Sequence, residues 1–319
     1  MNVLVYGWYN HQNLGDQLFI DAFKILFPEI IFTFTDTLII EDIKAASAIF
    51  IGGGSFLFSD PNISDECLLV LKTKKLLYIG VGAETNIHDV HKILMRHSSL
   101  IALRSSVGIE HIKKLNHNVI IIPDIVYCLR KTINVAKKHK SVLLLPNIYV
   151  VPQNTDPHWK YNAWDHFKFE YSQFLDHLIN NDFEIGFFPM CVNSKENDRN
   201  AAHEIINCMH HRGDYLINHQ ITDICELFSQ YETIITQRYH GIILAEMLNI
   251  PYISIFHHDK LKQSYLNAGI FTSYHEISKH SLIDQFNTIS NHKSKQTLPI
   301  ELNMYDDLKV AVSKILNGE

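Results

Sequence analysis

The chain has 319 residues, a formal net charge of −6, 46% apolar residues and 19% charged residues. This length suits two domains of about 150 residues each, and the composition is typical of a globular protein. The acidic balance argues against a nucleic-acid partner, because no basic surplus is present to neutralise phosphates.

Membrane, export and metal-binding patterns are not found in the sequence. No stretch reaches the ~20 apolar residues of a membrane span, and the N-terminus has no signal-peptide pattern. The five cysteines are widely spaced, odd in number and contain no CxxC pair, which predicts reduced thiols in a cytoplasmic protein. The twenty histidines form neither HExxH nor a Cys/His cluster, so we expect no metal site.

The first half of the chain alternates short apolar runs with amphipathic stretches. We expect strands at residues 2–7, 30–34, 48–51, 76–80, 100–103 and 118–122. Helices should follow Gly15-Asp16 and cover residues 107–115. This alternation predicts a doubly wound α/β domain with a parallel sheet.

Glycines and polar residues follow several of these strands. Asp16 comes after the first strand, where it serves either as the N-cap of the next helix or as part of a site. Gly53, Gly54 and Ser55 end a triple-glycine run that allows either a tight turn or close approach of a ligand. The run matches no nucleotide-binding motif.

Two later strands of this half also end in candidate site residues. Gly82 follows the fourth predicted strand, and Arg104 and Ser105 follow the fifth. Arg104 therefore lies at a strand-to-helix switch, where ligands bind in open α/β sheets.

The second half begins after a basic linker at residues 131–140. A long loop at 146–164 is rich in aromatic residues, which would either stack on sugars or cover an edge of the core. Strands are expected at 141–145, 183–189, 233–236 and 252–256, and helices at 167–180, 196–210, 223–229, 241–248, 281–289 and 305–316.

The turn at residues 237–241 is the most informative part of this half. Arg238, His240 and Gly241 lie between a strand and the helix after it. An arginine at a helix N-terminus opposes the helix dipole, which suggests that an anion completes the site. The alternative is a helix start with two solvated polar side chains.

Two α/β halves with polar residues at strand ends predict two Rossmann-like domains facing a cleft, as in glycosyltransferase-B enzymes. Several motifs together make the match narrower, and the sequence resembles the polysaccharide pyruvyltransferase family. The matching segments are NLGDQLFIDAF, FIGGGSFLFSD, YIGVGAE, ALRSSVGIEHI, IPDIVY and, most specifically, QRYHGIILAEMLNIPYISIFHHDK.

The resemblance implies an N-terminal domain at 1–135 on the acceptor side, which holds part of the donor site. It implies a C-terminal donor domain at 136–300 and a C-terminal helix at 301–319 that is free to pack back on the first domain. The activity implied is transfer of the enolpyruvyl skeleton of phosphoenolpyruvate onto two hydroxyls of a glycan or lipid-linked saccharide. The products are a cyclic pyruvate ketal and phosphate. The reaction is expected to need no cofactor. The sequence leaves both a monomer and a homo-oligomer as alternatives.

The family's functional positions give each candidate residue an expected role. Arg104 and Arg238 match the arginines that would hold the donor's two anionic groups. His240 would act as the acid or as a phosphate ligand, against the alternative of an ordinary helix-start histidine. The residues expected to bind substrate are Gly53, Gly54, Ser55, Gly82, Ser105, Gly241 and Lys260.

The chain departs from the family pattern at two positions. Ser105 and Gln17 stand where acidic residues are common in the family. If either of those carboxylates serves as the base for the acceptor hydroxyl, Asp16 would have to act alone in this chain, with altered or lost activity. Asp124 also matches a family position, without an assigned role. A nucleotide-sugar glycosyltransferase and a catalytically inactive glycan-binding relative are the alternatives to a pyruvyltransferase.

Overall fold

The computed structural model describes residues 1–54, 57–82, 86–130, 135–147, 157–194, 197–218, 223–256, 261, 268–291 and 302–318, without the side chains of 157–162, 291 and 302. The chain divides into two compact units. Unit 1 comprises Met1–Leu129 and Ile300–Glu319, and unit 2 comprises Arg130–Pro299. The first segment of unit 1 therefore ends at Leu129 and unit 2 begins at Arg130.

Unit 1 contains a six-stranded parallel sheet in the order β2-β1-β3-β4-β5-β6. Its strands are β1 (Asn2–Tyr6), β2 (Ile31–Thr35), β3 (Ala48–Gly54), β4 (Lys75–Val81), β5 (Leu100–Leu103) and β6 (Val119–Ile121). Its helices are α1 (Leu14–Leu26), α2 (Ile40–Ala45), α3 (Asp65–Leu71), α4 (Asp89–His97), α5 (Ile109–Lys113), η1 (Ile125–Leu129), η4 (Leu302–Tyr305) and α11 (Asp306–Asn317).

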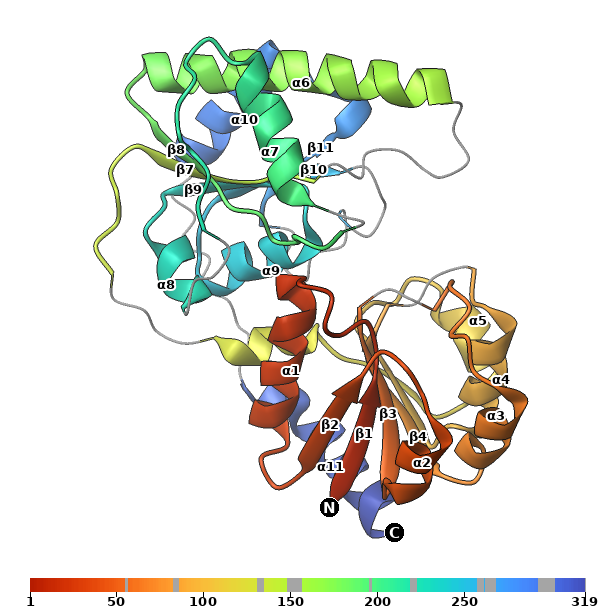
Figure 1. Cartoon of the computed structure of the whole chain (residues 1–319). Coiled ribbons are helices and arrows are strands. Elements are labelled where there is room, and N and C mark those ends of the chain that lie inside the picture. Colours follow the sequence, from red (N-terminus) through yellow and green to blue (C-terminus); the bar gives the residue numbers. More distant parts are fainter. Residues whose placement is uncertain are drawn as a thin grey trace. The chain divides into compact units, whose positions relative to one another are not determined.

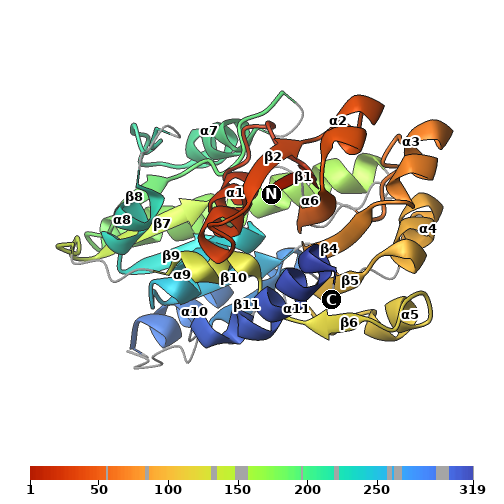
Figure 2. The same cartoon turned by 90° about the horizontal axis from the view of Figure 1, so that it is seen from below.

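Helices cover both faces of this sheet. In Figure 1, α3, α4 and α5 lie on one face and α1 lies on the other. The C-terminal helix α11 packs against β5 (Figure 2), and the ammonium of Lys75 donates a hydrogen bond to the Leu316 carbonyl at 2.8 Å. Because both faces are covered, the central strands are continuous apolar runs, which is why the sequence reveals them.

Unit 2 contains a five-stranded parallel sheet in the order β11-β10-β9-β7-β8. Helices α6, α7 and α10 lie on one face of it and α8 and α9 on the other (Figure 1). The strands are β7 (Ser141–Leu145), β8 (Glu184–Phe187), β9 (Thr233–Thr236), β10 (Tyr252–Phe256) and β11 (Ile270–Ser273). The helices are α6 (Pro157–Asn180), α7 (Asp198–Cys208), α8 (Ile224–Ser229), α9 (Tyr239–Met247), η3 (Tyr274–Glu276) and α10 (Lys279–Asn291).

The aromatic loop expected at 146–164 is in part a helix. Helix α6 begins at Pro157, because proline has no N–H to lose in the first helical turn. Trp164 is buried, its ring lies 5.5 Å from that of Phe167, and its indole N–H donates to Glu204 at 2.6 Å. Trp164 thus covers the core. Residues 148–156 lie outside the described residues.

A buried histidine makes the stability of unit 1 depend on pH. His91 of α4 is fully buried, with Nδ1 at 3.2 Å from the Tyr78 hydroxyl. Burial, assisted by the charge of His88, lowers its pKa to about 4. The folded state therefore favours the neutral imidazole. This contribution is fully present above the unfolded pKa and is lost as the pH falls from about 6.5 to about 4.

We expect the free energy of unfolding to fall by about 2 kcal/mol between pH 7 and pH 5 from His91 alone. The measurement is urea unfolding at both pH values in the wild type and in His91→Gln, which should lack this share of the pH dependence. His97→Gln, an exposed histidine of the same helix, should retain it. An equal pH dependence in wild type and His91→Gln would refute the assignment.

Candidate functional site

The carboxyl end of the unit 1 sheet brings Asp16 beside the glycine run. Helix α1 starts at Leu14 and is capped by Asn13, whose side chain accepts a hydrogen bond from the Gly15 N–H at 3.0 Å. Of the two alternatives for Asp16, the N-cap role is therefore wrong. Asp16 instead lies buried in the first turn, where the helix dipole favours a carboxylate. A Cβ added to Gly54 would lie 3.7 Å from Asp16 Oδ1.

The glycine run turns tightly against an aromatic side chain. Gly53 and Gly54 have φ values of +89° and +93°, a region that L side chains rarely adopt. The Tyr9 hydroxyl donates to the Gly52 carbonyl at 2.8 Å, and a Cβ on Gly53 would lie 2.8 Å from the same hydroxyl. Burial and the charge of Asp16 raise the pKa of Tyr9 well above its usual range.

Gly82 and Ser55 are the other two residues expected to bind substrate near the glycine run. Gly82 continues the same edge, and its N–H lies 3.5 Å from the Gly54 carbonyl. Ser55 lies outside the described residues.

Arg104 is held by a buried aspartate. It follows β5, and its Nη1 donates to Asp124 Oδ2 at 3.1 Å, with the two side chains 5% and 1% exposed. Asp124 Oδ1 also accepts the Val126 N–H at 3.0 Å. Burial raises the pKa of Asp124, while the Arg104 guanidinium and the Val126 N–H oppose that rise. The pair fixes the guanidinium at the carboxyl end of β5.

Two uncharged side chains, those of Ser105 and Tyr305, hold the backbone on either side of the Arg104–Asp124 pair. The Ser105 hydroxyl accepts the Val107 N–H at 3.0 Å, so it stabilises the turn after β5. Tyr305, fully buried where α11 begins, donates its hydroxyl to the Asp124 carbonyl at 2.8 Å. The C-terminal segment therefore supports the backbone of the residue that holds Arg104. Nothing in the local sequence around Tyr305 signals this contact.

Arg238 is held in the same way in unit 2. Its Nε donates to Asp198 Oδ2 at 3.1 Å, and its Nη2 donates to Asp198 Oδ1. Asp198 is fully buried and also accepts the Cys191 N–H at 2.9 Å. The Thr236 hydroxyl fixes the backbone of the turn, because it accepts from the Arg238 N–H and donates to the Arg238 carbonyl, each at 2.9 Å. Sequence reasoning did not find Asp198.

His240 and Gly241 open helix α9. His240 is half-buried, and its ring lies edge-on to that of Tyr239 at 5.5 Å between centroids. A Cβ on Gly241 would lie 2.3 Å from Thr236 Oγ1 and 2.5 Å from Leu145 Cδ1. Gly241 therefore lets α9 pack closely on its sheet, which explains this glycine without a ligand. Lys260 lies outside the described residues.

The two units thus repeat one arrangement. Each presents an arginine just after a strand of its parallel sheet, and each arginine is held by an aspartate from another segment. A guanidinium has five N–H donors, so a carboxylate at one edge can orient the group for a second anion. In open α/β sheets this edge is where ligands bind.

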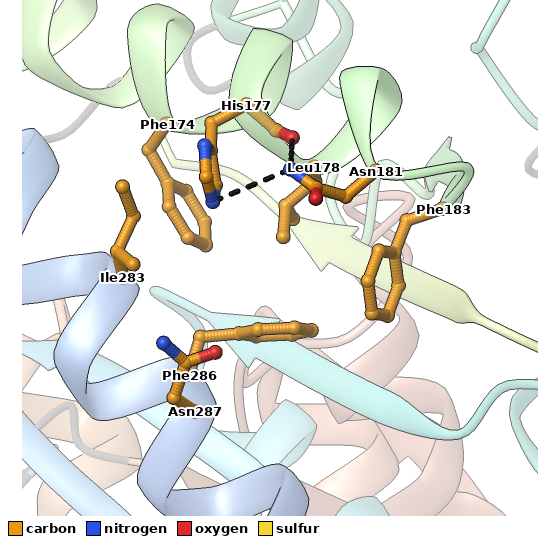
Figure 3. A pocket seen from close by; sticks show the side chains of 8 residues that line it. All are labelled: Phe174, His177, Leu178, Asn181, Phe183, Ile283, Phe286 and Asn287. Carbon is orange, nitrogen blue, oxygen red and sulfur yellow. Dashed lines mark hydrogen bonds between the residues drawn. The ribbon is translucent and has the colours of Figure 1, made fainter.

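A small cavity in unit 2 lies away from this edge. It measures about 110 Å³ and is lined by residues of α6, of α10 and of the turn between α6 and β8 (Figure 3), including Phe174, Phe286 and Phe183. The dashed lines join Asn181, in the turn just after α6, to His177 of α6. Phe183 immediately precedes β8, so the cavity lies near the amino end of that strand, whereas Arg238 follows the carboxyl end of β9.

Among the residues that the structure describes, no three His, Cys, Asp or Glu side chains group as metal ligands. Within the same described part of the chain, no helix combines the length and the apolar character needed to cross a bilayer.

The sequence profile of the polysaccharide pyruvyl transferase family matches residues 13–259. The chain belongs to this family. The match includes Asp16, the glycine run, both arginines and His240. No curated protein matches the chain.

Similar solved structures define the fold. UDP-N-acetylglucosamine 2-epimerase from Rickettsia bellii has a TM-score of 0.60 at 11% identity and covers 99% of this chain and 95% of its own. The UDP-GlcNAc 2-epimerase of Methanocaldococcus jannaschii, solved with UDP-GlcNAc and UDP, has a TM-score of 0.62 at 10% identity with full coverage of both chains. At such low identity the likeness shows the fold alone: two Rossmann-like domains of the glycosyltransferase-B type.

Proposed function

We propose that this family member transfers the enolpyruvyl skeleton of phosphoenolpyruvate onto two hydroxyls of a glycan sugar. The products are a cyclic pyruvate ketal and inorganic phosphate. The observation that supports this most directly is the repeated arginine–aspartate pair at a ligand-binding sheet edge. The donor carries a carboxylate and a phosphate, and arginine recognises both groups with paired N–H donors.

The reaction needs one proton donor and one proton acceptor. A proton is added to the methylene carbon of the donor while a sugar hydroxyl loses its proton and adds to the neighbouring carbon. Phosphate then leaves, and the second hydroxyl closes the ketal as its proton is transferred to the departing phosphate. We assign His240 as the acid or as a phosphate ligand. We assign Asp16 as the base for the acceptor hydroxyl, because no carboxylate stands at Gln17 or Ser105.

A nucleotide-sugar substrate is the second candidate, favoured by one observation. The Methanocaldococcus jannaschii structure of the same fold contains UDP-GlcNAc and UDP. A nucleotide diphosphate would also suit a sheet edge that carries arginine.

Two measurements separate these functions. We expect phosphoenolpyruvate to raise the melting temperature of the protein, and UDP and GDP to leave it unchanged, because a ligand stabilises the state that it binds. Phosphate release from phosphoenolpyruvate should require a particular hexoside and should vanish in Arg238→Ala and His240→Ala. The exposed Arg96→Ala and His97→Ala serve as matched controls that retain activity.

Stabilisation by a nucleotide alone would make the pyruvyl assignment wrong. Binding of phosphoenolpyruvate without release across all hexosides and a lipid-linked oligosaccharide would favour the inactive relative.

A further inference from the structure

The loop between β1 and α1 carries an exposed aromatic side chain in a fixed position. Trp8 is 45% exposed, whereas Tyr9 beside it is 1% exposed. The Trp8 ring stacks on the imidazole of His11, with centroids 3.8 Å apart and an angle of 18° between the planes. Since His11 covers one face of the indole, the exposed area lies on its other face and its edges.

The support beneath Trp8 continues through two further contacts. His11 Nε2 lies 3.0 Å from Asp36 Oδ2, just after β2. The hydroxyl of Thr37 donates to Asp36 Oδ1 at 3.2 Å, so the carboxylate is itself held. The indole is therefore backed by an imidazole and a carboxylate that come from the ends of neighbouring strands.

The backbone of this loop adopts an uncommon conformation. Asn10 and Gln12 both have positive φ, 65° and 50°, which costs free energy for residues other than glycine. The loop is fixed from below by Tyr9, whose hydroxyl binds the Gly52 carbonyl and whose ring packs edge-on to Phe34 at 5.1 Å. Strain of this kind persists where the surroundings impose it, and it concentrates at binding sites.

The place of the loop suggests what Trp8 meets. The loop runs from the carboxyl end of β1 directly into the first turn of α1, which holds Asp16 (Figure 1). An exposed indole face suits the C–H face of a pyranose ring, and the partly exposed Asp36 carboxylate can accept hydrogen bonds from ring hydroxyls. A phosphorylated three-carbon donor offers no such apolar face.

We propose that Trp8, supported by His11 and Asp36, forms the platform on which a pyranose ring of the acceptor glycan stacks. This inference rests on the proposed function, since it places the acceptor on the edge that carries Asp16. It makes Trp8 a determinant of acceptor affinity and leaves donor binding to other residues.

Direct binding tests the platform without any reaction. The protein has three tryptophans, so ¹⁵N spectra should show three indole N–H signals, and Trp8→Phe identifies the one from Trp8. Titration with methyl α- and β-pyranosides of glucose, galactose, mannose and N-acetylglucosamine should shift the Trp8 signal with at least one sugar. If none of these sugars shifts it, the platform is wrong, whatever the enzyme's activity.

Kinetics separates this inference from the proposed function. In an active wild type, Trp8→Ala should raise the KM for the acceptor about tenfold, with kcat and the KM for phosphoenolpyruvate within threefold. Trp8→Phe should give a smaller rise. Ile31→Ala removes an exposed apolar side chain at the opposite end of the sheet and should change nothing. An unchanged acceptor KM in Trp8→Ala would overturn the platform and leave the pyruvyltransferase proposal standing.

Discussion

Breaking the Arg238–Asp198 pair from either side is expected to lower the free energy of unfolding by about 3–5 kcal/mol. Asp198 is fully buried, so Arg238→Gln leaves its carboxylate without the guanidinium that offsets its desolvation. Asp198→Asn in turn leaves a guanidinium that is only 14% exposed without its carboxylate. Urea unfolding of the two variants measures both effects.

The double variant distinguishes the pair from the two residues taken separately. The double variant, Arg238→Gln with Asp198→Asn, removes both charges. Its loss of unfolding free energy should therefore be smaller than the sum of the two single losses by about 2 kcal/mol or more. The exposed pair Lys138–Glu184 of the same unit is the control, and Glu184→Gln should change stability little. Additive losses in the double variant would show that the two side chains do not interact.

Activity should respond differently to the two halves of this pair. Arg238→Gln removes the group proposed to bind the donor, and we expect phosphate release to fall at least ~1000-fold. Asp198→Asn keeps the guanidinium but loosens its orientation. We therefore expect kcat/KM to fall about 10- to 100-fold, mainly through a higher KM for phosphoenolpyruvate. Arg238→Lys keeps the charge without the planar fork and should resemble Arg238→Gln more than the wild type. Equal activity of Arg238→Gln and wild type would remove Arg238 from the site.

The sequence was sufficient to place the arginines but not the carboxylates that hold them. Apolar runs and helix periodicity are local signals, so Arg104 and Arg238 could be placed at strand ends from the chain alone. Asp198 lies 40 positions from Arg238 and Asp124 lies 20 positions from Arg104. Periodicity carries no information about pairs so far apart, and the family match gave Asp124 a position without a role.

Other differences between the elements expected from the sequence and those in the structure also have local causes. Asn13 and Asp16 both have side chains that cap helices, and only the observed start of α1 decides between them. Strand β11 is short and only partly buried, so IFTS lacks a strong pattern. Helices α2 and α3 have six and seven residues, too few for a clear amphipathic period. Short elements depend on the sheet that they cover more than on their own residues.

Loss of the Asp124 carboxylate is expected to lower the free energy of unfolding by about 2–4 kcal/mol and kcat/KM for phosphoenolpyruvate about 100-fold. Asp124→Asn places an amide beside Arg104 in a site where both side chains are 5% exposed or less. The amide has one acceptor oxygen and carries no charge, so it cannot accept from both Arg104 and the Val126 N–H as the carboxylate does. Urea unfolding and initial rates over a range of phosphoenolpyruvate concentrations measure the two losses.

A smaller change at the C-terminal segment tests the route through which Asp124 is supported. Tyr305→Phe removes the hydroxyl that donates to the Asp124 carbonyl, and the expected loss of stability is about 1 kcal/mol. The KM for phosphoenolpyruvate should rise about threefold, because the carboxylate that orients Arg104 is less firmly placed. Tyr274→Phe removes a similar hydroxyl, which donates to the Ala163 carbonyl at 3.1 Å in unit 2. It should cost similar stability without changing this KM. Equal KM values in both variants would assign Tyr305 a structural role only.

The pH dependence of Arg104→Gln provides the last distinction. Burial raises the pKa of Asp124, and the Arg104 guanidinium is the largest influence that opposes the rise. Without it the pKa rises further above that of the unfolded chain. A carboxyl group of this kind stabilises the fold when protonated, and that contribution is lost as the pH rises. The free energy of unfolding of Arg104→Gln should therefore be closest to that of the wild type near pH 4 and should fall progressively below it toward pH 8. His91 titrates in both proteins, so its contribution cancels in the difference. A difference that does not vary with pH would mean that Asp124 does not respond to Arg104.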